Sequence, residues 1–210
     1  ALAAGCGYPL NLNVPYTEND FWNGLPQEES MGYSMGKKML IVQSWTYRAQ
    51  YGFDSSILLP ANLYGPNDNF DLEKSHVVPA LIRKFLDAKQ NNLPSVEVWG
   101  TGNATREFLY VEDTAQAILD VAEKFNHSGP LNLGTGTETS VKELVETIVD
   151  LVQYEGDIVW NTDRPDGQAR RFYCMERFRE HMGYVPNTSL RDGLRKTIDW
   201  YLNSSDKKRL

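Results

Sequence analysis

Tyr33-Ser34-Met35-Gly36-Lys37 places a tyrosine and a lysine four residues apart. On a helix this spacing puts both side chains on one face, one turn apart. An ammonium held close to a phenol favours the phenolate and therefore lowers the tyrosine pKa. Such a tyrosine can pass a proton to a carbonyl oxygen while a hydride reaches the carbonyl carbon. The alternative is an ordinary tyrosine stacked over an exposed lysine, and the flanking sequence decides between the two.

The segments around this pair predict alternating helices and strands. Helical spacing of apolar residues predicts a helix over 31–51, and Gly52 supplies a stop signal. A short apolar strand over 55–60 follows, of the type found inside parallel sheets. Before the helix, residues 1–9 are predicted to be the end of a buried strand, and residues 10–30 a polar loop.

The same alternation continues to the end of the chain. The predicted helices cover 75–90, 112–124 with Asp113 as its cap, a segment opened by a capping box at Ser140, and 190–202. The predicted strands cover 96–100, 107–111, 131–134 and 157–160, and the predicted loops cover 101–106 and 164–171. Strands that alternate with helices in this way indicate the α/β class.

Composition narrows the class of protein. The net charge of −7 over 210 residues argues against a sequence-independent nucleic-acid binder, although a local arginine cluster could still bind an anionic small molecule. No apolar run approaches the roughly 20 residues of a membrane span, and the first residues do not resemble a signal peptide. With only Cys6 and Cys174, a disulfide framework is not expected, which favours a reducing, cytoplasmic location.

Several motifs in a fixed order carry a resemblance to a known superfamily. They are Tyr33-x-x-x-Lys37, the run Leu59-Pro60-Ala61-Asn62-Leu63-Tyr64-Gly65-Pro66, the run Arg106-Glu107-Phe108-Leu109-Tyr110-Val111-Glu112-Asp113, and Asn132-Leu133-Gly134-Thr135-Gly136. Together they resemble the extended short-chain dehydrogenase/reductase superfamily of sugar-nucleotide enzymes. Four further segments are similar to the GDP-L-fucose synthase family within it: Cys6-Gly7-Tyr8-Pro9, Asp68-Asn69-Phe70, residues 75–83 and Arg164-Pro165-Asp166-Gly167.

The resemblance implies a reaction in which GDP-4-keto-6-deoxymannose is epimerised at C3 and C5 and then reduced at C4 by NADPH. By this resemblance Tyr33 is the proton donor at C4, and Lys37 tunes it and holds the nicotinamide ribose. Cys6 and His76 match the pair that moves protons at C3 and C5, which is sensible beside a ketone that acidifies its neighbouring C–H bonds. Read alone, Cys6 would be a small buried hydrophobe and His76 a capping residue at a helix start.

The resemblance also implies two sets of binding residues. The NADP set is Tyr33, Lys37, Pro60, Asn62, Leu63 and His76, and the GDP-sugar set is Asn62, Lys84, Trp99, Arg106 and Arg171. Arginine offers a planar fork for a diphosphate, and Trp99 can present a flat face. The ordinary alternatives are a turn asparagine, a solvated lysine, a core aromatic residue and two surface arginines.

Two departures from the family stand out. The family carries Ser or Thr two residues before the cysteine, bonded to the C4 carbonyl oxygen, whereas this chain has Ala4. Family members also begin with a Gly-x-x-Gly-x-x-Gly turn for the cofactor pyrophosphate, and here only short Gly-x-Gly runs occur, at 5–7, 100–102 and 134–136. About the first hundred residues of the family therefore have no counterpart, and we expect exposed strand edges that need a partner.

These observations predict an α/β fold made of the C-terminal part of a Rossmann-like, doubly wound parallel-sheet domain and a smaller α/β domain. Residues 1–70 are assigned to the Rossmann-like part and 71–210 mainly to the substrate-binding part, with some segments returning to the first. By the resemblance, helix 31–51 forms a homodimer, or a partner chain supplies the missing half-domain. Two other functions stay open: a non-catalytic structural or assembly module, and another sugar-nucleotide epimerase or dehydratase.

Overall fold

The computed structural model describes residues 1–10 and 12–204, which form two compact units. Unit 1 contains Ala1–Leu63, Glu107–Glu138 and Arg170–Asn187, and unit 2 contains Tyr64–Arg106, Thr139–Ala169 and the segment from Thr188 onward. The predicted α/β class is confirmed, because helices alternate with parallel strand pairs. The assignment of the units to cofactor and substrate remains a prediction.

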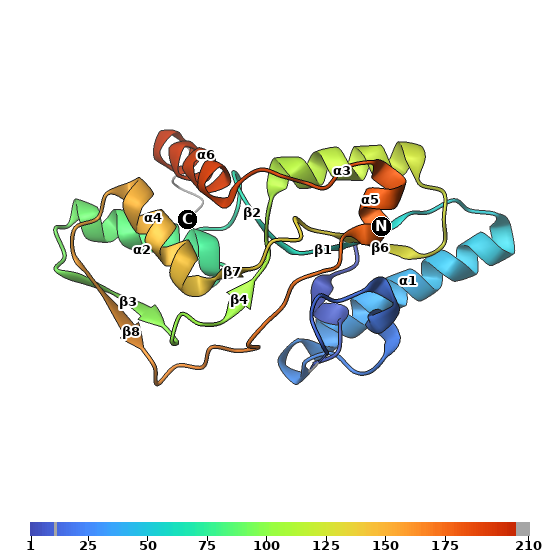
Figure 1. The fold of residues 1–210 in the computed structure, drawn as a ribbon, viewed down its shortest axis with the longest axis horizontal. Coiled ribbons are helices and arrows are strands. Elements are labelled where there is room, and N and C mark those ends of the chain that lie inside the picture. Colours follow the sequence, from blue (N-terminus) through green and yellow to red (C-terminus); the bar gives the residue numbers. More distant parts are fainter. Residues whose placement is uncertain (11, 205–210) are drawn as a thin grey trace. The chain divides into compact units, whose positions relative to one another are not determined.

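Unit 1 is built on a parallel strand pair. The pair is β1 (Ile57–Pro60) and β6 (Pro130–Leu133), with Leu58 opposite Leu131, and Leu2 adds a single parallel bridge to Leu58. The short strands β2 (Asn62–Tyr64) and β5 (Phe108–Tyr110) also pair. The helices are α1 (Met31–Tyr51), α3 (Val111–Lys124) and α5 (Glu176–Met182), and α3 and α5 lie side by side in Figure 1. Short 3-10 turns cover Gly5–Gly7, Glu18–Trp22 and Glu28–Ser30.

Helix α1 has the predicted bounds, but its buried face contains two polar residues, Ser34 and Lys38. It ends where Gly52 adopts a φ of 64°, the left-handed conformation typical of a helix stop. Its fully buried residues are Ser34, Lys38 and Ile41, and Lys38 Nζ donates to the carbonyls of Phe21 (2.7 Å) and Gly24 (3.1 Å). The carbonyl oxygens solvate the buried ammonium and fix the loop before the helix on its inner face.

Unit 2 pairs β3 (Ser95–Trp99) with β8 (Asp157–Asn161) in parallel, and these strands lie next to each other in Figure 1. The shorter β4 (Thr105–Arg106) and β7 (Thr139–Ser140) pair antiparallel. Three helices complete the unit: α2 (Val77–Gln90), α4 (Val141–Val152) and α6 (Leu190–Asn203). Helix α4 packs against both others, through a buried stripe of Leu144, Val145, Ile148 and Val152. The Ser140 hydroxyl accepts the Glu143 N–H (3.0 Å), as the capping motif predicted.

Some expectations were wrong. Residues 1–9 make one bridge at Leu2 and then a 3-10 turn instead of a strand end. Asp113 is not a cap: α3 starts at Val111 after Tyr110, so this carboxylate lies in the first turn, where it still complements the helix dipole. The predicted strand over 107–111 is shorter than expected: residues 108–110 form β5, the buried Glu107 precedes it, and Val111 already begins α3.

Other differences are smaller. Part of the predicted loop over 101–106 pairs as β4, and α5 had not been predicted, since a seven-residue helix gives little periodicity.

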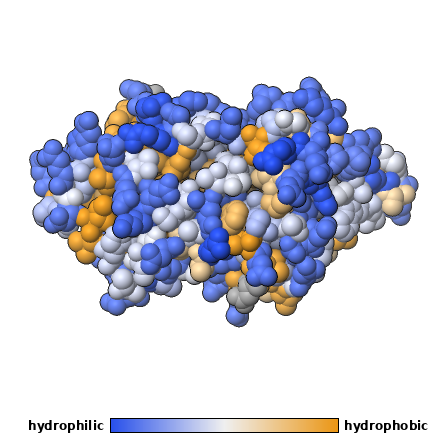
Figure 2. All heavy atoms as spheres, viewed as in Figure 1, coloured by the Kyte–Doolittle hydropathy of each residue, from blue (hydrophilic) through white to orange (hydrophobic). Residues whose placement is uncertain are grey.

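Figure 2 shows hydrophilic residues over most of the face drawn, with hydrophobic residues in separate patches. Within the described part of the chain, no helix is both long and apolar enough to cross a bilayer.

A buried polar network crosses the core of unit 1. Asn132, in the middle of β6, is fully buried, and its Oδ1 accepts the Tyr8 hydroxyl (2.6 Å). Its Nδ2 donates to the carbonyls of Tyr16 (2.9 Å) and Cys174 (3.2 Å), and its N–H donates to Glu18 (2.8 Å). One amide side chain thus satisfies groups from segments far apart in the sequence.

We expect Asn132→Leu to lower the free energy of unfolding by about 2–4 kcal/mol, because several buried polar groups would lose their partner at once. Urea denaturation measures this change. The control is Asn91→Leu, at the exposed end of α2, which should stay within about 0.5 kcal/mol of the parent. Equal effects of both substitutions would show that the network does not stabilise the unit.

Candidate functional site

Helix α1 carries Tyr33 and Lys37 on one face, one turn apart, as their spacing in the sequence predicted. Lys37 Nζ lies 5.5 Å from the centroid of the Tyr33 ring and donates to the Leu2 carbonyl (2.9 Å). Tyr33 is 60% exposed, so its hydroxyl is open to a ligand. The lysine is therefore fixed by the first residues of the chain while its charge stays beside the phenol.

Cys6 lies next to the same turn of α1. The buried Ser34 Oγ donates to the Cys6 carbonyl (3.1 Å) and also contacts the Ser30 hydroxyl (3.1 Å). Unit 1 thereby places the Cys6 backbone next to the turn of α1 that carries Tyr33 and Lys37. Sequence reasoning missed this role of Ser34, although a hydroxyl directly after the tyrosine was the available signal.

Pro60, Asn62 and Leu63 lie at the carboxyl end of β1, the end where ligands bind in open α/β sheets. The Asn62 N–H donates to the Glu107 carbonyl (3.2 Å), and Leu63 is 37% exposed. These residues hold the positions that the sequence predicted for a nicotinamide neighbourhood. Their contact with a cofactor remains a prediction.

Glu107 is a functional candidate that sequence reasoning missed. Its carboxylate is 1% exposed and accepts the N–H groups of Thr135, Gly136 (2.7 Å) and Tyr173 (2.9 Å). Burial raises the pKa of Glu107, and these N–H donors oppose the rise. A side chain at Gly134 would overlap the carboxylate, which explains a glycine at that point. Glu107 therefore ties the loop after β6 to the segment that carries Arg171.

The three Gly-x-Gly runs use their N–H groups within the protein. Thr135 and Gly136 donate to Glu107, and Gly7 donates to the Ala4 carbonyl (3.0 Å). The Thr101 N–H donates to Asp166 (2.7 Å). Each run thus uses at least one of its N–H groups within the protein, where a phosphate turn would direct them at the ligand.

In unit 2, Trp99 ends β3 with its side chain 59% exposed and two cations nearby. Lys84 Nζ lies 5.7 Å and the Arg164 guanidinium carbon 5.0 Å from the indole ring. Arg164 was predicted as part of a charged loop and of a segment similar to the family, but not as a binding residue, so this contact was missed. The arrangement suits an anionic ligand with a flat ring.

Arg106 lies beside the loops that follow β3 and β8. Its guanidinium donates to the Thr105 carbonyl (2.7 Å) and the Asp166 carbonyl (3.4 Å). The Asp166 carboxylate accepts the Thr101 hydroxyl (2.6 Å) and N–H, and these bonds hold the pKa of Asp166 below its ordinary value. Asp166 thus joins the two loops and fixes the backbone to which Arg106 is bonded.

His76 stands immediately before α2, with an exposed side chain. Its imidazole makes no capping hydrogen bond, so the simple capping role considered from the sequence is not what the structure shows. The predicted site residues divide between the units. Unit 1 holds Cys6, Tyr33, Lys37, Pro60, Asn62, Leu63 and Arg171, and unit 2 holds His76, Lys84, Trp99 and Arg106.

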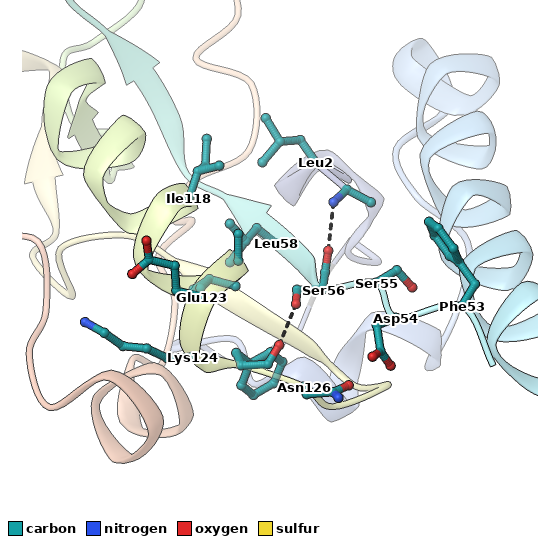
Figure 3. Close-up of a pocket in the computed structure, with 14 residues that line it drawn as sticks. Leu2, Phe53, Asp54, Ser55, Ser56, Leu58, Ile118, Glu123, Lys124 and Asn126 are labelled. Carbon is teal, nitrogen blue, oxygen red and sulfur yellow. Dashed lines mark hydrogen bonds between the residues drawn. The ribbon is translucent and has the colours of Figure 1, made fainter.

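A pocket of about 640 Å³ in unit 1 lies elsewhere (Figure 3). Leu58 and Ile118 line it, together with Ser56, whose hydroxyl donates to the Phe125 carbonyl (2.6 Å). Ser56 precedes β1, so the pocket is at the amino end of the strand, opposite to the predicted site residues. Among residues 1–10 and 12–204, no three His, Cys, Asp or Glu side chains are grouped to hold a metal ion.

Comparison with known proteins agrees with this geometry. The sequence profile of the NAD dependent epimerase/dehydratase family matches residues 2–134. The chain is 39% identical over 203 residues to a probable GDP-L-fucose synthase 1 of Oryza sativa subsp. japonica, covering 97% of this chain and 62% of the relative. It is 36% identical over 217 residues to the GDP-L-fucose synthase of Escherichia coli K12, covering 99% and 67%.

A solved structure shares the fold. The GDP-L-fucose synthetase of Naegleria fowleri bound to NADP superposes with a TM-score of 0.92 at 28% identity, covering 100% of this chain and 67% of that one. The chain thus spans about three fifths to two thirds of the length of these relatives. The match extends over more than half of the chain, and the chain belongs to the NAD dependent epimerase/dehydratase family, as its motifs predicted.

Proposed function

We propose that this chain carries the catalytic side chains and the GDP-sugar contacts of an NADPH-dependent 3,5-epimerase/4-reductase of the GDP-L-fucose synthase type, which converts GDP-4-keto-6-deoxymannose to GDP-L-fucose. The observation that carries the proposal is the cluster on unit 1. There Lys37 lies beside the open Tyr33 ring, and Ser34 bonds the Cys6 backbone to the same helix turn. Relatives with the GDP-L-fucose synthase name support the substrate class.

In the reduction, bound NADPH would supply the hydride to C4 of the sugar. Tyr33 gives its hydroxyl proton to the carbonyl oxygen, so that the ketone becomes an alcohol. Lys37 places its ammonium next to the ring of this phenol. Its bond to Leu2 holds the ammonium in place, and its remaining N–H groups can bind a ribose.

In the epimerisation, Cys6 and His76 exchange protons at C3 and C5. The ketone at C4 acidifies both C–H bonds, so one side chain can remove a proton and the other return one to the opposite face. Cys6 lies in a turn fixed by Ser34, and the exposed His76 imidazole is free of a capping bond. Both groups are thus available for proton transfer.

Unit 2 would bind the nucleotide. The exposed indole of Trp99 can stack on guanine, and Lys84, Arg164 and Arg106 supply positive charge for the diphosphate. In unit 1, Arg171 would add a further contact to the GDP-sugar.

A non-catalytic module of the same family is the second candidate. Ala4 in place of a hydroxyl residue and the occupied N–H groups of the glycine runs favour it. It predicts neither proton exchange nor NADPH binding. Another sugar-nucleotide epimerase or dehydratase is a less favoured third candidate, because Cys6 and the segment around His76 match the GDP-L-fucose synthase family.

The exposed face of α1 carries an apolar stripe that could pair with another protein chain. Met35, Met39 and Val42 are 43%, 55% and 37% exposed at spacings of four and three, a stripe suited to pairing with a second helix. We propose a homodimer through this stripe, with a partner chain that completes the sheet as the alternative. A cytoplasmic location stays a prediction from cysteine content.

The epimerase chemistry can be tested without cofactor. In D₂O the chain should place deuterium at C3 and C5 of GDP-4-keto-6-deoxymannose, as followed by proton NMR. Cys6→Ser and His76→Asn should each slow exchange by about 10²- to 10⁴-fold. The matched controls are Cys174→Ser and His181→Asn, which should exchange at the parent rate. Lack of exchange by the parent chain would favour the non-catalytic module, and equal rates in all variants would exclude the assigned pair.

Nucleotide binding tests unit 2. Calorimetry should show that GDP binds more tightly than guanosine, and Arg106→Ala should raise the dissociation constant for GDP about tenfold, equivalent to about 1.4 kcal/mol. Arg195→Ala, an arginine on α6 of the same unit, is the control and should leave the constant unchanged. Identical constants for both variants would remove Arg106 from the site.

Sedimentation tests the α1 stripe. Met39→Glu places a charge in the proposed interface and should raise the dimer dissociation constant at least about tenfold, since a buried unpaired charge is costly. Leu119→Glu changes a 61% exposed leucine on α3 and should not alter the distribution of species. A parent chain that is monomeric at every concentration would contradict the homodimer.

A further inference from the structure

Tyr173 is a buried tyrosine that the mechanism above does not use. Its side chain is 3% exposed and its ring packs against Tyr8, with 5.6 Å between centroids. Its backbone is fixed on both sides, because its N–H donates to Glu107 (2.9 Å) and the neighbouring Cys174 N–H donates to the Tyr16 carbonyl (2.8 Å). The ring therefore has a defined direction.

The Tyr173 hydroxyl occupies the space of a missing side chain beside Cys6. A Cβ built on Gly5 would overlap this hydroxyl, would lie 2.8 Å from the ring carbon that bears it, and would lie 3.0 Å from the Pro60 carbonyl oxygen. The hydroxyl thus reaches the Gly5–Cys6 turn at the carboxyl end of β1. Glycine at position 5 is what allows it there.

This hydroxyl has an unused proton. Among residues 1–10 and 12–204 it takes part in no hydrogen bond, whereas the nearby Tyr8 hydroxyl donates to Asn132. In this part of the chain, the fully enclosed side-chain atoms without a partner belong to Arg48 and Ser75, and the Tyr173 oxygen is not among them. An acceptor atom on a ligand is therefore a suitable partner for this hydroxyl.

The proton stays on the hydroxyl at neutral pH. Burial raises the pKa of Tyr173, and negative charge on Glu107 and Cys6 adds to the rise, while Arg171 opposes it. Tyr173 is therefore suited to donate a hydrogen bond and unsuited to act as a base.

We propose that Tyr173 Oη donates a hydrogen bond to the carbonyl oxygen of the substrate, in the role of the hydroxyl that position 4 lacks in this chain. This inference rests on the proposed function. As the carbonyl carbon gains the hydride, negative charge grows on the oxygen and Tyr173 stabilises it. Tyr173 keeps its own proton, and Tyr33 gives the one that completes the alcohol. Preorganised donors to such an oxygen typically contribute about 100- to 1000-fold in rate.

Infrared spectroscopy of GDP-4-keto-6-deoxymannose labelled with ¹³C at C4 tests the hydrogen bond directly, without turnover. Bound to the parent chain, the labelled carbonyl should stretch at a lower frequency than when bound to Tyr173→Phe, because the hydrogen bond weakens the C=O bond. Adding Ala4→Ser to Tyr173→Phe should return the lower frequency. Tyr154→Phe, which removes a buried hydroxyl bonded to Leu93 in unit 2, is the control and should leave the band unmoved.

The outcomes separate this inference from the function on which it rests. Binding of the keto sugar with the same carbonyl frequency in the parent and Tyr173→Phe overturns the role of Tyr173 and leaves the proposed function intact. Failure of the parent chain to bind the keto sugar overturns the proposed function and the role of Tyr173 with it. Where NADPH-dependent turnover is measurable, Tyr173→Phe should lower kcat about 100- to 1000-fold with little change in KM, and Ala4→Ser should restore most of it.

Discussion

The buried carboxylate of Glu107 is the constraint on which the candidate site of unit 1 depends. A carboxylate removed from water needs donors, and here they are backbone N–H groups from the loop after β6 and from Tyr173. Because these donors come from two separate segments, their bonds to one side chain fix both at the same end of the sheet. Glu107 thus ties the β6 loop to the backbone of Tyr173.

Positive side chains are concentrated beside Trp99 although the chain as a whole is acidic. The protein is acidic overall, with a net charge of −7, yet Lys84 and Arg164 both lie over the exposed indole of Trp99. Each cation is attracted by the electron-rich face of the indole. A local positive site in an acidic protein attracts an anionic small molecule without attracting nucleic acid.

The features that could be predicted from the sequence are those set by residues close together in the chain. The bounds of α1, the Ser140 cap and the Tyr33–Lys37 face all follow from residue spacing, and the family followed from the order of motifs. Roles that depend on residues distant in the chain were missed. The bond from Ser34 to Cys6 and the bond from Tyr173 to Glu107 join residues separated by 28 and 66 positions, and the sequence around either residue does not identify its partner.

The chemistry of Glu107 also explains why the glycine run after β6 is not a phosphate site. Successive N–H groups at Thr135 and Gly136 form a concave site of the kind that binds anions, and the protein fills it with its own carboxylate. Gly134 is required for that filling, because a side chain there would displace Glu107. These N–H groups are therefore not open to the phosphates of a ligand. The glycine run resembles a phosphate turn in sequence and in shape, but its anion is part of the fold.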